Sequence, residues 1–341
     1  MADALLSPAV GLSMWGATAG VMAYCSLKVQ QERDERRIPL MGVLGAFIFA
    51  AQMINFTIPA TGSSGHLGGG LLLAILLGPH AAFLTIASVL VVQSLFFADG
   101  GILALGCNIF NLGVFPAFIA YPFVYKKLAG AKNNPTRISL AAILASVLAL
   151  QLGAFAVVVE TVASGVSSLP FSSFVLLMQP IHLAIGLVEG AVTAAVVSFV
   201  CKARPDILRS VSTGQQGGGR PLRNLVLAFL AAALLTGGVF SWFASENPDG
   251  LEWSIAKITG TEEVVHDVDG IHGFFANLQE KLSFLPDYGF KTSEDSPAVS
   301  AAGVESDGAR LSTSVSGFVG GLLSLAIAFL LGTLLRRQQT A

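Results

Sequence analysis

One imidazole stands inside a glycine-rich stretch that interrupts an otherwise apolar sequence. Residues 61–70 read TGSSGHLGGG, and His66 is the side chain in this stretch that is able to ligate a metal strongly. Five glycines and two serines in ten residues do not favour a membrane-exposed helix. Irregular backbone at membrane depth is tolerated only where it is buried in protein or lines a cavity. Because imidazole suits Zn, Ni, Cu and Co, the stretch is a candidate metal-binding loop. The alternative is a hydrogen-bonded loop histidine with no ligand.

Other polar side chains fall within apolar runs. Asp99 lies between two such runs, and Asn108 and Asn111 are three apart, on one face of a helix. His182 and Glu189 are seven apart, so they share a helix face at roughly 10 Å along its axis. That separation is too long for both to hold one ion, and it favours a buried polar pair. Intramembrane polar groups indicate function by default, so Asp99, the two asparagines and His182 are candidates to surround a ligand. Interhelical hydrogen bonding explains the asparagines equally well.

An enzymatic alternative follows from the same stretch. Residues 62–65 spell GSSG, a pattern of intramembrane serine proteases, in which Ser64 would be the nucleophile and His182 its base. Small-residue patterns of this length are common in helical membrane proteins because they allow close packing, so this interpretation is weak. The sequence contains no GxxxxGK[ST] and no HExxH. If transport is active, its energy therefore comes from a partner protein or from an ion gradient, the latter making the chain a self-sufficient ion-coupled metal permease.

The elements that must position these residues are membrane helices. The chain of 341 residues is 53% hydrophobic and only 12% charged, about half the charge of a soluble domain. A membrane span needs about 20 apolar residues. The sequence predicts nine spans, at 9–27, 40–58, 67–78 (short), 81–97, 103–125, 138–158, 174–200, 223–244 and 314–335.

The basic residues predict the orientation of these spans. Fifteen of the nineteen Lys and Arg residues fall in four places, 28–37, 126–137, 202–223 and 336–337. With nine spans and an external amino terminus, all four places are cytoplasmic, as the positive-inside rule requires. The His66 loop is then external, and so is the stretch 245–313, in which thirteen acidic residues face four basic ones.

Composition also predicts two domains. Residues 206–222 are polar and basic and contain GQQGGG, which is typical of a cytoplasmic linker. The region 223–341 then reads as a helix, an external loop (245–313) and a returning helix. Within that loop, residues 291–313 have the composition of a flexible tether, and residues 246–290 have enough apolar content to fold as a small unit.

Several of these segments resemble a known family. The segments DALLSP (3–8), SGHL (64–67), FADGGILALGCNIFN (97–111) and HLAIGLVEGA (182–191) resemble the substrate-binding membrane component of energy-coupling-factor cobalt/nickel importers, the CbiM/NikM family. The likeness covers about residues 1–205. NPDGLEW (247–253) resembles the PDGLE element of the accessory CbiN/NikN component, so the chain resembles a fusion of the two.

The resemblance implies a fold and a function. The fold is an all-α polytopic membrane protein, with a seven-helix substrate-binding domain (1–205) and a two-helix accessory domain (223–341) that carries an extracytoplasmic loop. The function is capture of Ni²⁺ or Co²⁺ outside a bacterial or archaeal cell for delivery inward, with no cofactor apart from the transported ion. The resemblance also implies separate partners, a CbiQ/NikQ-like coupling membrane subunit and a CbiO/NikO-like ATPase subunit, in a lipid bilayer and without nucleic acid.

The resemblance further implies a near-planar site of four nitrogens. In the family the free amine, the amide and imidazole of the second residue, and the loop histidine supply these ligands, a geometry that suits Ni(II). Here His66 matches the loop histidine, and the Met1 amine and the Ala2 backbone amide match two further positions. The family's second-residue histidine has no counterpart, because the chain begins Met-Ala-Asp; a start two residues upstream, at Met-His, would restore it. Ser64, Asp99, Asn108, Asn111 and His182 are the predicted surroundings of this site.

Overall fold

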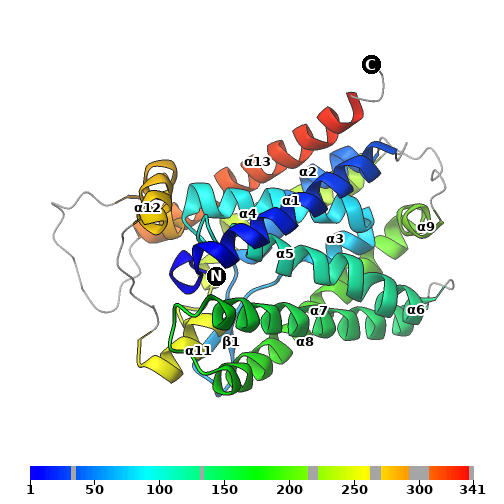
Figure 1. Ribbon diagram of the computed structural model, residues 1–341. Coiled ribbons are helices and arrows are strands. Elements are labelled where there is room, and N and C mark those ends of the chain that lie inside the picture. The colour runs from blue at the N-terminus through cyan, green and yellow to red at the C-terminus, as the bar shows by residue number, and fades with distance from the viewer. Residues whose placement is uncertain (32–35, 131–133, 214–221, 262–269, 292–306, 338–341) are drawn as a thin grey trace.

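The described chain is almost entirely helical, which confirms the all-α polytopic prediction (Figure 1). The computed structural model describes residues 1–31, 36–130, 134–213, 222–261, 270–291 and 307–337. Six helices are long and apolar enough to cross a membrane. They are α1 (Pro8–Gln31), α4 (Pro79–Phe97), the composite helix Leu105–Ala129, α7 (Pro135–Ser164), α8 (Phe171–Ala203) and α13 (Asp307–Arg337). Two shorter apolar helices of 16 residues, α2 (Arg37–Gln52) and α10 (Arg223–Gly238), lie beside them.

The composite helix has an irregular middle. It begins as α5 (Leu105–Val114), continues as the π-helical segment η2 (Phe115–Tyr125) and ends as α6 (Lys126–Ala129). Pro122 lies inside the π-helical segment, where it has no backbone N–H to donate. The sequence predicts one uniform span here and does not reveal the wider turns.

The glycine-rich stretch forms a hairpin followed by half a helix. Strands β1 (Phe56–Ile58) and β2 (Ser63–Gly65) pair antiparallel, with Thr57 opposite Ser64. The helix α3 (Gly70–Leu77) has eight residues, all buried, so it spans only about 12 Å. Gly69 precedes it in the left-handed region at φ +76°. The predicted span 40–58 is therefore too long, since α2 ends at Gln52; the predicted short span corresponds to α3.

The carboxyl-terminal helices pack against the first part of the bundle. Helix α13 lies along α2 and α10, and its glycines permit a close approach. A Cβ atom on Gly320 would overlap the Phe49 ring, and one on Gly317 would overlap the backbone of Gly237. The two helices that the sequence assigns to an accessory domain thus share an extensive interface with α2.

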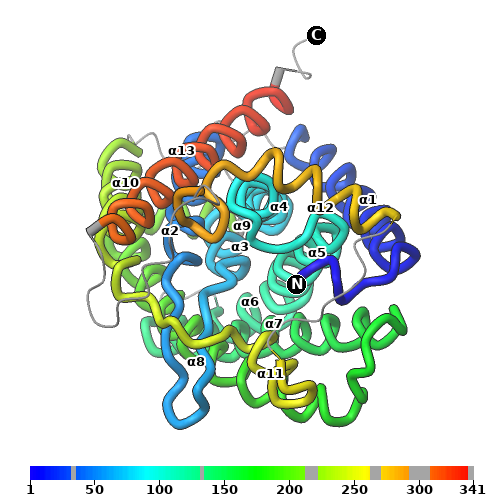
Figure 2. Tube along the Cα trace, turned by 90° about the vertical axis from the view of Figure 1, so that its left-hand side faces the viewer, coloured from blue at the N-terminus to red at the C-terminus, as the bar shows by residue number. Residues whose placement is uncertain are grey.

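Different helices cover the two ends of the bundle. Helices α6 and α9 (Pro205–Thr213) lie at one end, together with the carboxyl-terminal ends of α1 and α13 (Figure 1). Helices α11 (Gly250–Thr259) and α12 (Gly270–Leu282) and the 3₁₀ turn η4 (Pro286–Tyr288) cover the opposite end, which faces the viewer in Figure 2. The short 3₁₀ turns η1 (Asp3–Leu5) and η3 (Phe240–Phe243) complete the described elements.

Three expectations for the carboxyl-terminal half need correction. The described residues of 246–290 do not form a unit of their own, because α11 packs on α8 and β2 while α12 packs on α4. In the expected tether, α13 already begins at Asp307, and residues 292–306 lie outside the described residues. In the expected linker, residues 206–213 belong to α9, and residues 214–221 are again outside the described part.

Candidate metal centre

A buried carboxylate fixes the backbone that follows His66. Glu189, on α8 and 3% exposed, accepts hydrogen bonds from the backbone N–H groups of Gly68 (2.7 Å) and Gly69 (3.2 Å). Both glycines lie at the amino-terminal end of α3, where unpaired N–H groups and the helix dipole favour a negative charge. From α2, the Gln52 Nε2 donates to the Gly68 carbonyl over 2.9 Å. The loop is therefore attached to two helices directly after its histidine.

Residues 247–253, called the PDGLE segment below, hold the hairpin that precedes His66. The Ser64 N–H donates to the Pro248 carbonyl and the Ser64 hydroxyl to the Asn247 carbonyl, each over 2.8 Å. The Trp253 indole N–H donates to the Thr61 carbonyl over 3.0 Å. Because these bonds join residues more than 180 positions apart, the carboxyl-terminal half directly supports the loop that carries His66.

A capping box fixes the position of the PDGLE segment itself. The Asp249 carboxylate accepts from the backbone N–H groups of Leu251 (2.7 Å) and Glu252 (2.9 Å), at the start of α11. The Glu252 side chain accepts in return from the Asp249 N–H. Gly250 lies against α8, where a Cβ atom would come within 2.7 Å of Ile181 and 3.1 Å of His182.

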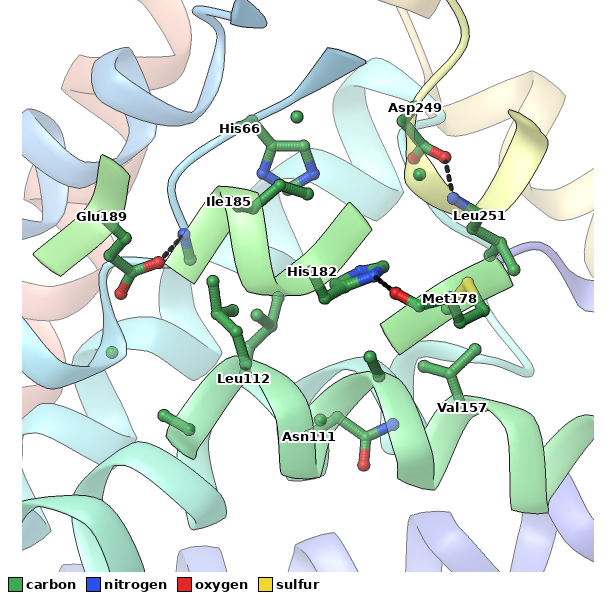
Figure 3. Close-up of a pocket in the computed structure, with 18 of the residues that line it drawn as sticks. His66, Asn111, Leu112, Val157, Met178, His182, Ile185, Glu189, Asp249 and Leu251 are labelled. Atoms are coloured by element: carbon green, nitrogen blue, oxygen red, sulfur yellow. Dashed lines mark hydrogen bonds between the residues drawn. The ribbon is translucent and has the colours of Figure 1, made fainter. Parts of the chain in front are cut away.

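Two imidazoles line the same small cavity of about 140 Å³. His66 contributes from the loop and His182 from α8, with Glu189 and Asp249 around the same opening (Figure 3). Each imidazole donates its Nδ1–H to a backbone carbonyl, His66 to Leu67 (3.2 Å) and His182 to Met178 (2.8 Å). This bond leaves Nε2 as the nitrogen of each ring that could ligate a metal, the usual arrangement of a ligating histidine.

The amino-terminal segment enters the bundle beside His66. The Met1 carbonyl accepts from the Gly101 N–H (3.1 Å) and from the Asn108 side-chain amide (3.3 Å). The Asp3 carboxylate accepts from the Ala104 N–H over 2.8 Å, and it lies so close to Gly101 that a Cβ atom there would overlap it. This contact explains why the DGG sequence after α4 ends in glycine. Met1 lines the small cavity together with His66.

A larger cavity of about 600 Å³ adjoins the small one. The two share several lining residues, among them Met1, His66, Asn108 and Asp249. Ala2, Gln52 and Asp99 line only the large cavity, whereas Asn111, His182 and Glu189 line only the small one. His66 therefore stands where the cavities meet.

Asp99 is engaged by a residue of the carboxyl-terminal half. The Tyr288 hydroxyl donates to the Asp99 carboxylate and accepts from the Gln93 side-chain amide over 3.4 Å. Burial, together with the neighbouring Asp99 charge, holds the pKa of Tyr288 well above its ordinary value. The phenol therefore remains protonated at neutral pH and keeps its role as donor.

Ser64 is not placed as an activated nucleophile. Ser64 is fully buried and does not line either cavity, and its hydroxyl donates to the Asn247 carbonyl. Such a bond does not remove the hydroxyl proton, because its acceptor is a backbone carbonyl and not the His182 imidazole. Ser64 thus stabilises the hairpin through its hydrogen bonds and does not line either cavity.

The structure places the predicted residues as follows. Met1, Ala2, His66, Asp99, Asn108, Asn111 and His182 line one or both cavities, and Ser64 does not. Within the described ranges, no three His, Cys, Asp or Glu side chains converge as a metal-binding group. A nitrogen-rich site around His66 would therefore need backbone or amino-terminal nitrogen.

The sequence does not identify several residues that support the site. Asp249 and Trp253 belong to the PDGLE segment, which the sequence identifies only as a motif, although its D-x-x-E spacing is a signal for the capping box. The sequence predicts that Glu189 is a buried polar residue, but it does not predict the partners of this carboxylate. Tyr288 carries no local signal, because its contacts lie 189 and 195 residues away.

Fold and site define a polytopic membrane protein with a histidine-bearing cavity inside its helices, as expected of a membrane transport component. The family model for the cobalt uptake substrate-specific transmembrane region matches residues 1–207, and the PDGLE domain model matches residues 223–337. The chain belongs to the CbiM family and carries a PDGLE domain.

Individual relatives agree with this assignment. A putative fused nickel transport protein NikMN of Archaeoglobus fulgidus is 31% identical over 311 residues, covering 91% of each chain. The cobalt transport protein CbiM of Geobacter sulfurreducens is 28% identical over 264 residues, covering 73% of this chain and 74% of the relative. The crystal structure of a transition metal transporter, 29% identical, superposes with a TM-score of 0.54 over 64% of this chain and 99% of that one.

Proposed function

We propose that the protein captures Ni²⁺ or Co²⁺ outside the cell and delivers the ion inward as the substrate-specific component of an energy-coupling-factor transporter. Family membership and the nickel and cobalt transport relatives support this function. A CbiQ/NikQ-like coupling membrane subunit and a CbiO/NikO-like ATPase would be separate chains, since this sequence has no P-loop. The end covered by α11 and α12 would face outward, because the lysines in the last turns of α1, α6 and α8 lie toward the opposite end.

One observation carries the site assignment. His66 and the Met1–Ala2 segment are far apart in the sequence, but both line the large cavity. Hydrogen bonds from Gly101 and Asn108 hold the Met1 carbonyl there. The ligands we assign are the His66 Nε2, the Met1 amine and the Ala2 backbone nitrogen. Nitrogen ligation of this kind suits Ni(II) and also accommodates Co(II). Asn108, Asn111, His182 and Asp99 would surround the ion.

The first test is a histidine substitution in the purified chain. His66→Ala removes the imidazole at the junction of the cavities and is expected to weaken Ni²⁺ and Co²⁺ binding more than tenfold, measured by titration with separation of bound metal. His80→Ala is the matched control, because His80 packs against Tyr24 and Phe118 and lines neither cavity. Equal loss of binding in both variants, or in neither, would contradict the assignment of His66.

A further inference from the structure

The loop that carries His66 lies against the face of α8 that carries His182. Gly65, directly before His66, is so close to this helix that a Cβ atom there would come within 2.4 Å of the Ile185 side chain. Glu189 holds the backbone directly after His66 through its two hydrogen bonds. His182, Ile185 and Glu189 follow one another at spacings of three and four, so they share one face of α8. His66 is thus held over the same helix face as His182.

Each of the two rings keeps one nitrogen that is open to the small cavity. The Nδ1 of His66 is bonded to the Leu67 carbonyl and that of His182 to the Met178 carbonyl, so Nε2 is in both rings the nitrogen that could ligate. Neither Nε2 atom has a hydrogen-bond partner among the described residues, and neither is sealed from the cavity. Both rings border the same opening (Figure 3). A ligand that enters the small cavity therefore meets two available imidazole nitrogens.

The other polar groups of the small cavity are largely engaged. Glu189 accepts from the loop backbone, and Asp249 accepts from the backbone at the start of α11. The Asn111 side-chain amide donates to the Glu160 carboxylate over 2.9 Å. Most of the remaining lining is apolar, including Leu112, Leu150, Val157 and Ile185. Imidazole nitrogen is thus the ligand type that this cavity offers to a metal ion.

The position of His182 relative to the other ligands makes it complementary to them. The set assigned above contains three nitrogens, from His66, Met1 and Ala2, whereas a square-planar Ni(II) site uses four ligands. Met1 and His66 line both cavities, Ala2 lines only the large one and His182 only the small one. An ion held by Met1 and His66 where the cavities meet is therefore approached by Ala2 from one cavity and by His182 from the other.

We infer that His182 is a further metal ligand, whose Nε2 supplies the fourth nitrogen beside His66, Met1 and Ala2. This inference rests on the proposed function and deepens it, because it assigns His182 to the ligands of the ion and not only to its surroundings. The bond from Nδ1 to the Met178 carbonyl orients the ring for this role. A site with two imidazoles suits Ni²⁺ and Co²⁺ and disfavours Mg²⁺ and Ca²⁺, which prefer oxygen ligands.

The experiment counts imidazole ligands by X-ray absorption spectroscopy of Ni²⁺ bound to the purified full chain. The wild-type spectrum is expected to contain the scattering of two imidazoles, and the spectra of His66→Ala and His182→Ala that of one each. Ni²⁺ affinity should fall more than tenfold in His182→Ala. Gln179→Ala is the control on the same helix, because Gln179 bonds to Gln151 of α7 and lines neither cavity, so this variant should retain two imidazoles.

The outcomes separate ligation by His182 from a structural role and from the proposed function itself. A wild-type spectrum with one imidazole would overturn the inference, and this measurement depends on no variant. Weaker binding by His182→Ala with an unchanged imidazole count would also overturn it, since the ring would then only shape the cavity. Absence of Ni²⁺ and Co²⁺ binding by the wild-type chain would instead contradict the proposed function.

Discussion

At the scale of single residues, Glu189 holds the backbone that directly follows His66. Its two oxygens accept from two adjacent glycine N–H groups, and nothing smaller than a carboxylate offers that pair of acceptors at this reach. The residue lines the small cavity, and its carboxylate is bonded to the loop backbone and not to the His66 ring (Figure 3). We therefore treat Glu189 as a positioning residue.

Substitution of Glu189 tests this role. In Glu189→Gln one acceptor becomes an NH₂ group that faces a backbone N–H, so the loop after His66 loses a bond and gains a repulsive contact. Ni²⁺ affinity is expected to fall about tenfold, as for other residues that orient a ligand. Hydrogen exchange at the Gly68 and Gly69 amides should rise at the same time. Protected amides together with unchanged affinity would show that the loop does not depend on this carboxylate.

How much of the site the sequence predicts depends on the distance between partners along the chain. His66 is identified locally, since its glycine-rich surroundings and apolar flanks are contiguous. Its supports are not, because Glu189 lies about 120 residues from the glycines it holds and Pro248 lies 184 residues from Ser64. A single sequence shows that a buried acid needs a partner, but does not name that partner.

At the scale of elements, the unusual unit is the hairpin and half-helix between α2 and α4. The sequence predicts that residues 61–70 are not helical, because of their glycines. It does not predict the pairing of β1 with β2 or that residues 53–58 leave α2, since these residues remain predominantly apolar. Helix α11 supports this unit from outside the bundle and packs against α8 through Gly250, which has no side chain.

Gly250→Ala tests the docking of α11. The added Cβ atom would lie 2.7 Å from Ile181 and 3.1 Å from His182, so the start of α11 must move away from α8. We expect Ni²⁺ affinity to fall about threefold to tenfold through loosening of the hairpin, and hydrogen exchange at the Ser64 amide to increase. Gly289→Ala is the control, because a Cβ atom there makes an ordinary 3.6 Å contact. Wild-type behaviour of both variants would mean that α11 does not press on the loop.

At the scale of the whole molecule, the question is what the carboxyl-terminal half contributes. Three of its contacts with the first half bear on this question: one along α2 through α10 and α13, one on the hairpin through the PDGLE segment, and one on Asp99 through Tyr288. The first contact lies among the apolar helices, where lipid can replace protein at little cost because both are apolar. The other two lie at the entrance to the cavities and consist of hydrogen bonds to specific groups, which lipid cannot replace.

Deletion of residues 224–341 should therefore separate folding from loading. Residues 1–223 are expected to remain helical and membrane-inserted, measured by circular dichroism and size-exclusion elution in detergent, because the packing they lose is replaced by apolar surroundings. Metal uptake in cells that supply the coupling partners should fall severalfold, since the hairpin loses its Asn247 and Pro248 acceptors and the large cavity loses three of its four carboxylates.

Supplying residues 223–341 as a separate chain should restore part of the uptake, because the interface along α2 needs no covalent link. Unchanged uptake after the deletion would show that the first half loads metal alone, whereas an aggregated residue 1–223 fragment would show that α2 requires α13 to fold.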